Sequence, residues 1–232
     1  MQEFEVYVLI RKGESSMDYQ KIDELLLKIK SAYESIGAET ELVVEEPASI
    51  AEVEAIENII ERKLPLQIRD FFLQYSKKCE LSAWLPDGFE LPSELDEIFS
   101  ANFLISLEEF ADAEKARKGW VENCFTNEED EYDAVWYNKL GFMNVPNGDV
   151  LAFDMKESEI NPSVVYLSHD DGEGHGYILG KDFNTYFEQL LLVGACGNED
   201  WQMLPFCLDA QSGIVSDCEN AKEYRKLIGL QI

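Results

Sequence analysis

Basic residues are scarce in this sequence, and histidine is almost missing. The 232 residues contain 19 Lys and Arg and two His against 47 Asp and Glu, so the formal net charge is −28. Without a basic stripe, the chain lacks the groups that neutralise phosphates, which argues against direct nucleic-acid binding. Anionic membranes would repel it for the same reason. The charge favours solubility in water or attraction of a cationic partner.

Cysteine is also sparse, and long apolar runs are missing. The five cysteines are odd in number and form no CxxC pair, which disfavours a disulfide framework or structural zinc and is typical of a reducing cytoplasm. The opening run MQEFEVYVLIRKGE has acidic residues within its apolar stretch and no small-residue cleavage pattern, so we predict no signal peptide. No uncharged apolar run approaches the length of about 18 residues that a membrane span needs.

Known enzyme signatures are missing as well. The sequence contains no phosphate-binding GxxxxGK[ST] loop, no GxSxG, no HExxH and no Gly-rich dinucleotide fingerprint. Carboxylate pairs that could act as acid and base are numerous among so many acids, and no pair stands out. We therefore predict a non-enzymatic protein with no cofactor. A hydrolase with an unrecognised acidic site remains the less favoured alternative.

What is present predicts a folded α+β protein. Hydrophobic residues make up 46% and aromatic residues 12% of the chain, which argues against disorder despite the charge. Apolar alternation over residues 4–10 predicts a strand, helical spacing from Ile22 to Ile36 predicts a helix that ends at Gly37, and TELVVEE predicts a second strand. We assign this strand-helix-strand unit to an N-terminal module, residues 1–48.

Residues 49–232 are predicted to form the main domain. Ser49 and Glu52 make a capping box before a first helix, Pro65 opens a second, and LEEFADAEKARKGWVEN is a third. Strands follow on both sides of the hairpin turn at Asn147-Gly148, and again around residues 163–180. A closing helix begins after Asp182, and a last helix lies near residues 219–228. The predicted core positions are Trp136, Phe142, Val150, Ala152 and Phe153 in the sheet and Leu64, Phe71 and Phe72 in the helical layer.

Both histidines lie in one short stretch, VVYLSHDDGEGHGYILG, at residues 164–180. His169 and His175 stand beside Asp170, Asp171 and Glu173, a set of side chains that suits a divalent metal or a hydrolytic site. The three glycines at 172, 174 and 176 are ordinary turn residues, and a pliable loop holds metal ligands poorly. We interpret the stretch as an acidic turn between two strands and predict no metal site.

The order of these elements resembles a known family. VEAIENIIERKLPLQIRDFF, NGDVLAFD, SVVYLSHDD and DFNTYFEQLL are similar to the opening helices, hairpin, next strand and closing helix of the SUKH superfamily. This group joins fungal cell-wall-synthesis regulators with many bacterial proteins. The resemblance covers residues 49–195, and GNEDWQMLPF is similar to an extension of bacterial members. It implies helices packed on a mainly antiparallel sheet, and Ser76-Lys77-Lys78 replaces a turn that often follows the second helix.

The resemblance also implies a function. Bacterial members are widely taken to be immunity proteins that neutralise toxins, many of them nucleases, whereas the fungal relatives imply a regulatory scaffold. Residues 120–175 contain thirteen Asp and Glu against Lys139 and Lys156, and such a surface could compete with phosphates for the basic cleft of a nuclease. We predict that the partner is a cognate toxin with a basic surface, in the cytoplasm. The predicted partner-binding residues are Glu128, Glu129, Asp130, Glu131, Tyr132, Asp133, Trp136, Asp170, Asp171 and Glu173. A solvated acidic face is the alternative interpretation.

Overall fold

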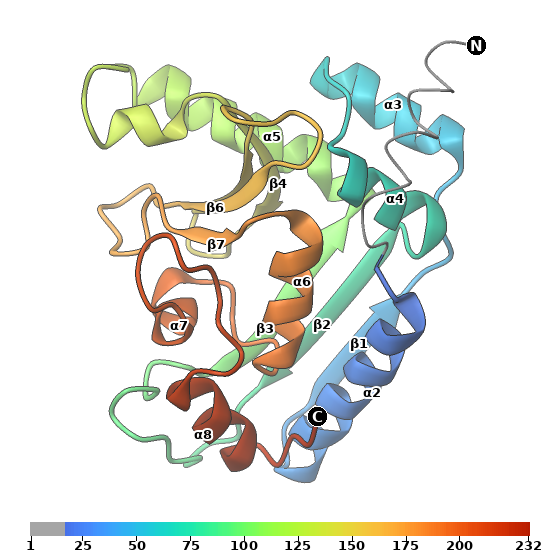
Figure 1. Ribbon diagram of the computed structural model, residues 1–232, viewed down its shortest axis with the longest axis vertical. Helices are drawn as coiled ribbons and strands as arrows, with labels where there is room; N and C mark the ends of the chain where they lie inside the picture. Colours follow the sequence, from blue (N-terminus) through green and yellow to red (C-terminus); the bar gives the residue numbers. More distant parts are fainter. Residues whose placement is uncertain (1–16) are drawn as a thin grey trace.

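Residues 17–232 are described by a computed structural model of the chain (Figure 1). The strand predicted at residues 4–10 lies outside this range. The first described helix, α2 (Tyr19–Ser35), is capped by Asp18, whose side chain accepts a hydrogen bond from the backbone N–H of Lys21. It ends shortly before Gly37, whose φ of 91° suits glycine, so this predicted stop is confirmed.

Three further helices lie between residues 50 and 123, as the capping residues and the helical spacing of apolar positions predict. Ser49 and Glu52 form the predicted capping box, in which the Ser49 hydroxyl accepts from the Glu52 N–H and the Glu52 carboxylate accepts from the Ser49 N–H. Ser106 caps the third helix by accepting from the Glu109 N–H. The helices are α3 (Ile50–Ile60), α4 (Leu66–Gln74) and α5 (Leu107–Asn123).

The first sheet was only partly predicted. It is antiparallel with the order β1-β2-β3, built from β1 (Thr40–Val44), β2 (Lys78–Trp84) and β3 (Ser100–Ser106). The sequence predicted β1 but neither β2 nor β3. Cys79, Leu81 and Ala83 of β2 are buried, so this strand has an inner and an outer face.

The second sheet contains the predicted hairpin and strand pair. It is antiparallel with the order β4-β5-β6-β7, and Gly148 has a φ of 104° in the turn between the first two strands. Helix α5 packs closely on β4, because a Cβ atom at Gly141 would lie 2.7 Å from the Ala113 carbonyl oxygen. The strands are β4 (Lys139–Asn144), β5 (Val150–Asp154), β6 (Ser163–Leu167) and β7 (Ile178–Gly180). The predicted α+β class is confirmed.

The C-terminal part returns to the first sheet. Asp182 caps the predicted closing helix by accepting from the Thr185 N–H, and the last predicted helix is also present. The elements are α6 (Phe183–Leu192), α7 (Asp200–Met203), the 3-10 helix η2 (Leu204–Phe206) and α8 (Glu219–Leu227). None of the helices within residues 17–232 is long and apolar enough to cross a membrane.

One core joins both ends of the described chain. Phe187 of α6 packs edge-on against Phe71 of α4 and Phe103 of β3, at centroid distances of 5.5 and 5.4 Å. In α2, the buried Tyr33 hydroxyl lies 2.7 Å from the Tyr224 hydroxyl of α8. Helix α2 and strand β1 precede the boundary predicted at residue 48, yet they share a sheet and a core with residues that follow it.

Candidate functional site

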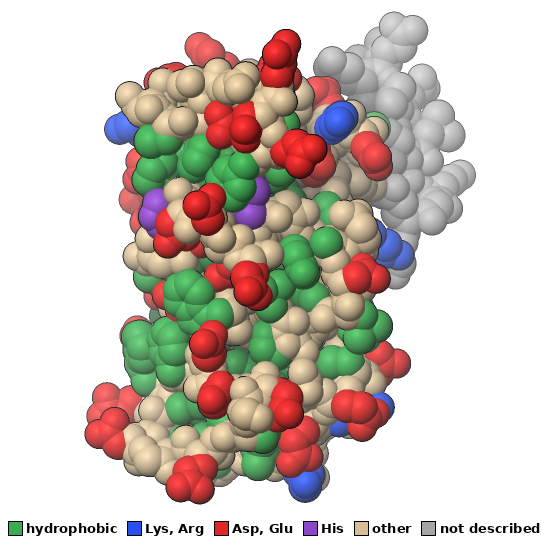
Figure 2. Space-filling view, turned by 90° about the vertical axis from the view of Figure 1, so that its left-hand side faces the viewer, with side chains coloured by type: hydrophobic (Ala, Val, Ile, Leu, Met, Phe, Trp, Pro, Cys, Tyr) green, Lys and Arg blue, Asp and Glu red, His purple; other side chains and the backbone are tan. Residues whose placement is uncertain are grey.

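Two acidic loops lie side by side on one side of the molecule. The 127–133 loop follows α5, and the 168–176 loop connects β6 to β7; together we call them the loop pair. Figure 1 shows both at the left of the upper half, and Figure 2 faces that side and shows both histidines there among acidic and apolar side chains. The loop pair therefore brings together two segments that the sequence separates by more than thirty residues.

Tyr132 makes the main contact between the two loops. Its ring stacks on the His175 ring, with centroids 3.8 Å apart and an interplanar angle of 16°. Its hydroxyl donates to the Ser168 carbonyl oxygen at 2.6 Å and accepts from the Asp171 N–H at 3.0 Å. One side chain of the first loop thus fixes the backbone of the second at two points.

The His175 ring completes the contact as a neutral imidazole. Its Nδ1 accepts from the Ser168 N–H at 3.0 Å, so the proton resides on Nε2, which donates to the Tyr132 carbonyl oxygen at 3.0 Å. Burial lowers the pKa of His175, because the charged form loses hydration. The neutral tautomer matches both backbone partners.

A buried polar network supports the second loop from below. The Asp149 carboxylate accepts from the Tyr166 hydroxyl at 2.6 Å and from the His169 N–H at 2.8 Å. The Tyr166 hydroxyl in turn accepts from the Asp200 N–H at 3.1 Å. The Asp200 carboxylate accepts from the Gly174 N–H at 2.9 Å, and burial raises the pKa of Asp200. The buried carboxylates of Asp149 and Asp200 therefore position the backbone of the 168–176 loop.

The glycines of the 168–176 loop are required for close approach. A Cβ atom at Gly172 would lie 2.6 Å from the Ser168 hydroxyl oxygen, and one at Gly174 would lie 2.5 Å from the Asp200 Cβ. The prediction of an acidic turn between two strands is confirmed. Side chains also pack directly against Gly172 and Gly174 and bond to the loop backbone, so these two glycines serve close packing as well as the turn.

His169 lies apart from the Tyr132–His175 contact. Its ring packs on Trp120 at a centroid distance of 4.8 Å, and its Nδ1–H donates to Asp149 Oδ1 at 2.7 Å. Among the described residues, Asp149, His169 and Asp170 offer ligand atoms within 4.8 Å of one another. A cation bound there through Nδ1 of His169 would have to break the His169–Asp149 hydrogen bond. The absence of a metal therefore stays a prediction.

Comparison with known protein families matches residues 47–189 to the SMI1/KNR4 family (SUKH-1). The chain belongs to this family. The comparison with curated proteins finds no match. The resemblance read from the sequence is confirmed, and the match begins close to the predicted boundary at residue 49. Both loops of the loop pair lie inside the SUKH-1 match, whereas β1 and α8 lie outside it.

The SUKH-1 fold exposes most of the predicted partner-binding residues. Tyr132 and Asp133 are half-buried, and the carboxylates at the remaining acidic positions are exposed, namely Glu128, Glu129, Asp130, Glu131, Asp170, Asp171 and Glu173. None of these acidic residues forms an ion pair with any part of the chain that the structure describes. No ion pair within residues 17–232 therefore compensates the negative charge of the loop pair.

Trp136 is the exception among the predicted contact residues. Its side chain is fully buried, stacked on Phe125 at 4.8 Å and packed with Val150 and Leu167 in a second small core. It belongs to the 3-10 helix η1 (Asp133–Trp136), where the sequence predicted a strand. The prediction that Trp136 contacts the partner is wrong, since no partner can reach it without unfolding η1. Its predicted place in the core is confirmed.

Not all acids of the loop pair are free to bind a partner. Asp130 Oδ1 accepts from the N–H groups of Tyr132 and Asp133, at 2.9 and 3.2 Å. Asp133 accepts from the Asn127 N–H at 2.9 Å, and Asp170 bonds the Ser168 hydroxyl at 3.0 Å. Among the acidic residues of the loop pair, five have side chains that make no hydrogen bond with any described residue, namely Glu128, Glu129, Glu131, Asp171 and Glu173. The sequence did not separate these two groups.

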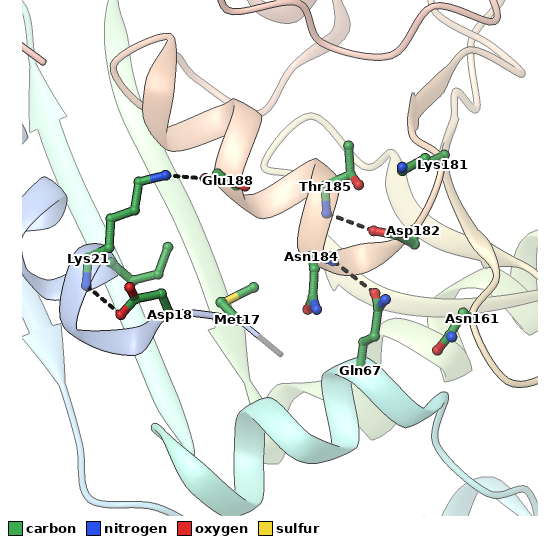
Figure 3. Close-up of a pocket in the computed structure, with 11 residues that line it drawn as sticks. Met17, Asp18, Lys21, Gln67, Asn161, Lys181, Asp182, Asn184, Thr185 and Glu188 are labelled. Carbon is green, nitrogen blue, oxygen red and sulfur yellow. Dashed lines mark hydrogen bonds and ion pairs between the residues drawn. The ribbon is translucent and has the colours of Figure 1, made fainter. Parts of the chain in front are cut away.

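A pocket lies elsewhere, between α2, α4 and the start of α6 (Figure 3). Its volume is about 590 Å³. Its charged groups are largely paired, since Lys21 contacts Glu188 at 2.5 Å and Asp182 caps α6. The Gln67 side chain accepts from the Asn184 N–H at 3.0 Å. No sequence motif indicated a site here. The groups drawn in Figure 3 serve mainly to join the three helices.

Proposed function

We propose that this SUKH-1 protein is a non-enzymatic immunity protein that binds and neutralises a cognate protein toxin with a basic surface. The observation that carries the proposal is the loop pair, whose exposed carboxylates have no cationic partner within residues 17–232. A nuclease toxin needs a cationic cleft to hold phosphates. Carboxylates placed against that cleft would occupy it in place of the substrate.

The rigidity of the loop pair supports this proposal. The Tyr132–His175 stack and the bonds from Asp130, Asp149 and Asp200 fix the loop backbone. The five carboxylates without structural bonds then stand on an ordered support. A preordered surface loses little conformational entropy on binding, so more of the interaction energy is available for affinity.

The buried acids favour binding over catalysis. Asp149 is 1% and Asp200 4% exposed, and both accept hydrogen bonds from backbone N–H groups of the same loops. Tyr166 lies between them and bonds both residues. Their hydrogen bonds serve to hold the loops, which supports the proposal over a hydrolase with an acidic site. We place the protein in the cytoplasm, where a toxin would meet its target.

A charge reversal confined to the loop pair tests the function. We expect the triple variant Glu128→Lys, Glu129→Lys and Glu131→Lys to fold normally and to lose protection of cells that express the candidate toxin, taken as the product of a neighbouring gene. Asp130 is left in place because its carboxylate holds the turn. Protection is measured as colony survival during induction of the toxin.

The matched control reverses three exposed glutamates far from the loop pair, Glu39, Glu41 and Glu54, which also make no side-chain bond with a described residue. Both triple variants have the same net charge, so only the location of the change differs. Equal protection by the two variants would show that the loop pair is not the toxin-binding surface. A wild-type chain that neither protects cells nor binds the neighbouring gene product would contradict immunity and favour the regulatory scaffold of the fungal relatives.

A further inference from the structure

Two exposed aromatic rings stack on each other at one end of the first sheet. The outer face of β2 presents Lys78, Glu80 and Ser82, as expected for a solvated surface, and then Trp84. Trp84 is 58% exposed and Phe99 is 40% exposed. Their rings are 5.5 Å apart at an interplanar angle of 18°. Large aromatic surface left in water at a position where polar side chains are the norm points to a binding partner.

The backbone around the two rings is well fixed. The Leu85 N–H donates to the Phe99 carbonyl oxygen at 2.9 Å, which closes the segment between them into a loop. The N–H groups of Phe99 and Ser100 both lie 3.3 Å from Gln202 Oε1. Leu95 and Ile98 bury their side chains beneath the loop. The rings are therefore held at the surface by ordered structure and are not in a frayed end.

The loop that connects these two aromatic residues is acidic. The loop from residue 86 to residue 98 contains no Lys or Arg, and its five acids are all exposed: Asp87, Glu90, Glu94, Asp96 and Glu97. None of them forms an ion pair with a residue in the described range 17–232. We call Trp84, Phe99 and these five acids the aromatic patch. In Figure 2, acidic side chains gather around apolar ones in the lower half of the face shown.

We propose that the aromatic patch binds a basic segment of a partner polypeptide, with an arginine side chain stacked on Trp84 and bonded to carboxylates of the 86–98 loop. A guanidinium group is planar and weakly hydrated, so it stacks on an indole and bonds carboxylates at the same time. A lysine ammonium is a compact, strongly hydrated charge and fits this combination less well. Charge complementarity excludes an anionic membrane or a nucleic acid as the occupant.

This surface stands apart from the loop pair and does not depend on the proposed function. The 85–99 segment lies at the lower end of the side of the molecule whose upper end contains the loop pair (Figure 1). It also lies inside the SUKH-1 match. The patch can bind a basic segment whether or not the chain is an immunity protein.

Labelled peptides test the proposal directly on the full chain. The probe is a nine-residue peptide with four arginines alternating with alanine, compared with the same peptide carrying lysine or glutamate, with fluorescence anisotropy as the readout. We expect the arginine peptide to bind more tightly than the lysine peptide and the glutamate peptide not to bind. The Trp84→Ala variant should weaken binding of the arginine peptide about two- to fivefold, as the range of cation–π energies at exposed sites implies. Ile59→Ala, at another exposed apolar side chain (65%), should leave its affinity unchanged.

Neutralising the acids of the aromatic patch provides a second test of the proposal. Glu94→Gln, Asp96→Asn and Glu97→Gln together should weaken the arginine peptide, whereas the triple Lys variant at residues 128, 129 and 131 should change its affinity less than the patch variant does. Equal binding by wild type and Trp84→Ala would overturn the proposal and reduce it to nonspecific attraction by net charge. A wild-type dimer in sedimentation that Trp84→Ala converts to a monomer would overturn it as well, since a second copy would then be the occupant.

Discussion

At the scale of single residues, His175 links the stability of the loop pair to pH. Burial lowers the pKa of His175 in the folded chain below the value of about 6.5 expected for an unfolded chain. The unfolded state therefore binds the proton more readily, and protonation also places a hydrogen on Nδ1, which must accept from the Ser168 N–H. The stabilising contribution of neutral His175 is complete above pH 6.5 and is lost as the pH falls below it.

We expect the urea concentration at the unfolding midpoint of the wild type to decrease when the pH is lowered from 7.5 to 5. The His175→Ala substitution should reduce this pH dependence. Glu199 and Asp200 act in the opposite direction, because burial raises the pKa of each in the folded state. The difference between wild type and variant, measured at each pH, isolates the histidine. A variant with the same pH dependence as the wild type would contradict the assigned tautomer.

A second prediction at this scale concerns metal binding by Asp149, His169 and Asp170. The His169–Asp149 hydrogen bond of 2.7 Å and the bond from Tyr166 to Asp149 already engage both carboxylate oxygens of Asp149. We expect elemental analysis of the purified protein to find much less than one zinc or manganese ion per chain. One ion per chain that is lost in His169→Ala would show that these residues form a metal site.

At the scale of elements, α4 joins the helical layer to the core through Phe72. Its side chain is fully buried and contacts the rings of Phe71 and Phe110 at 5.8 and 6.4 Å. We expect Phe72→Ala to lower the free energy of unfolding by about 3–4 kcal/mol, because the loss of the ring leaves a cavity. The measurement is urea unfolding followed by circular dichroism. The same substitution at the exposed Phe99 should cost about 1 kcal/mol or less, and equal costs would contradict the assigned helix face.

At the scale of the whole molecule, the net charge of −28 should govern how fast a basic partner associates. Exposed charges are screened beyond about 8 Å at 0.15 M salt, so the acids nearest the contact act most strongly. We expect the triple Lys variant at residues 128, 129 and 131 to lower the association rate about tenfold or more at low salt. The matched variant at residues 39, 41 and 54 should lower it much less. Stopped-flow rates that fall equally in both variants would show that only total charge matters.

The elements that the sequence predicted share a local signal. α5 and α6 follow from their capping residues and from the spacing of their apolar side chains, and the β4–β5 hairpin follows from Asn147-Gly148. The first sheet was missed, although Cys79, Leu81 and Ala83 alternate with polar residues in β2. None of these three residues is β-branched or aromatic, so they are weak strand signals. In addition, the β2–β3 connection is too long to contain a recognisable hairpin turn.

The sequence by itself determined the class of the fold, the family and the excess of acid over base, because periodicity, caps and composition are local or summed properties. Only the tertiary structure decided which acids are free. Asp130 and Asp149 hold loop backbone while Glu128 and Glu131 face solvent, and all four are carboxylates in acidic segments. Only the folded chain places Tyr132 on His175 and buries Trp136. The physical reason is that sheet pairing sets which distant loops meet, and a residue's type does not reveal whether its hydrogen bonds are already made.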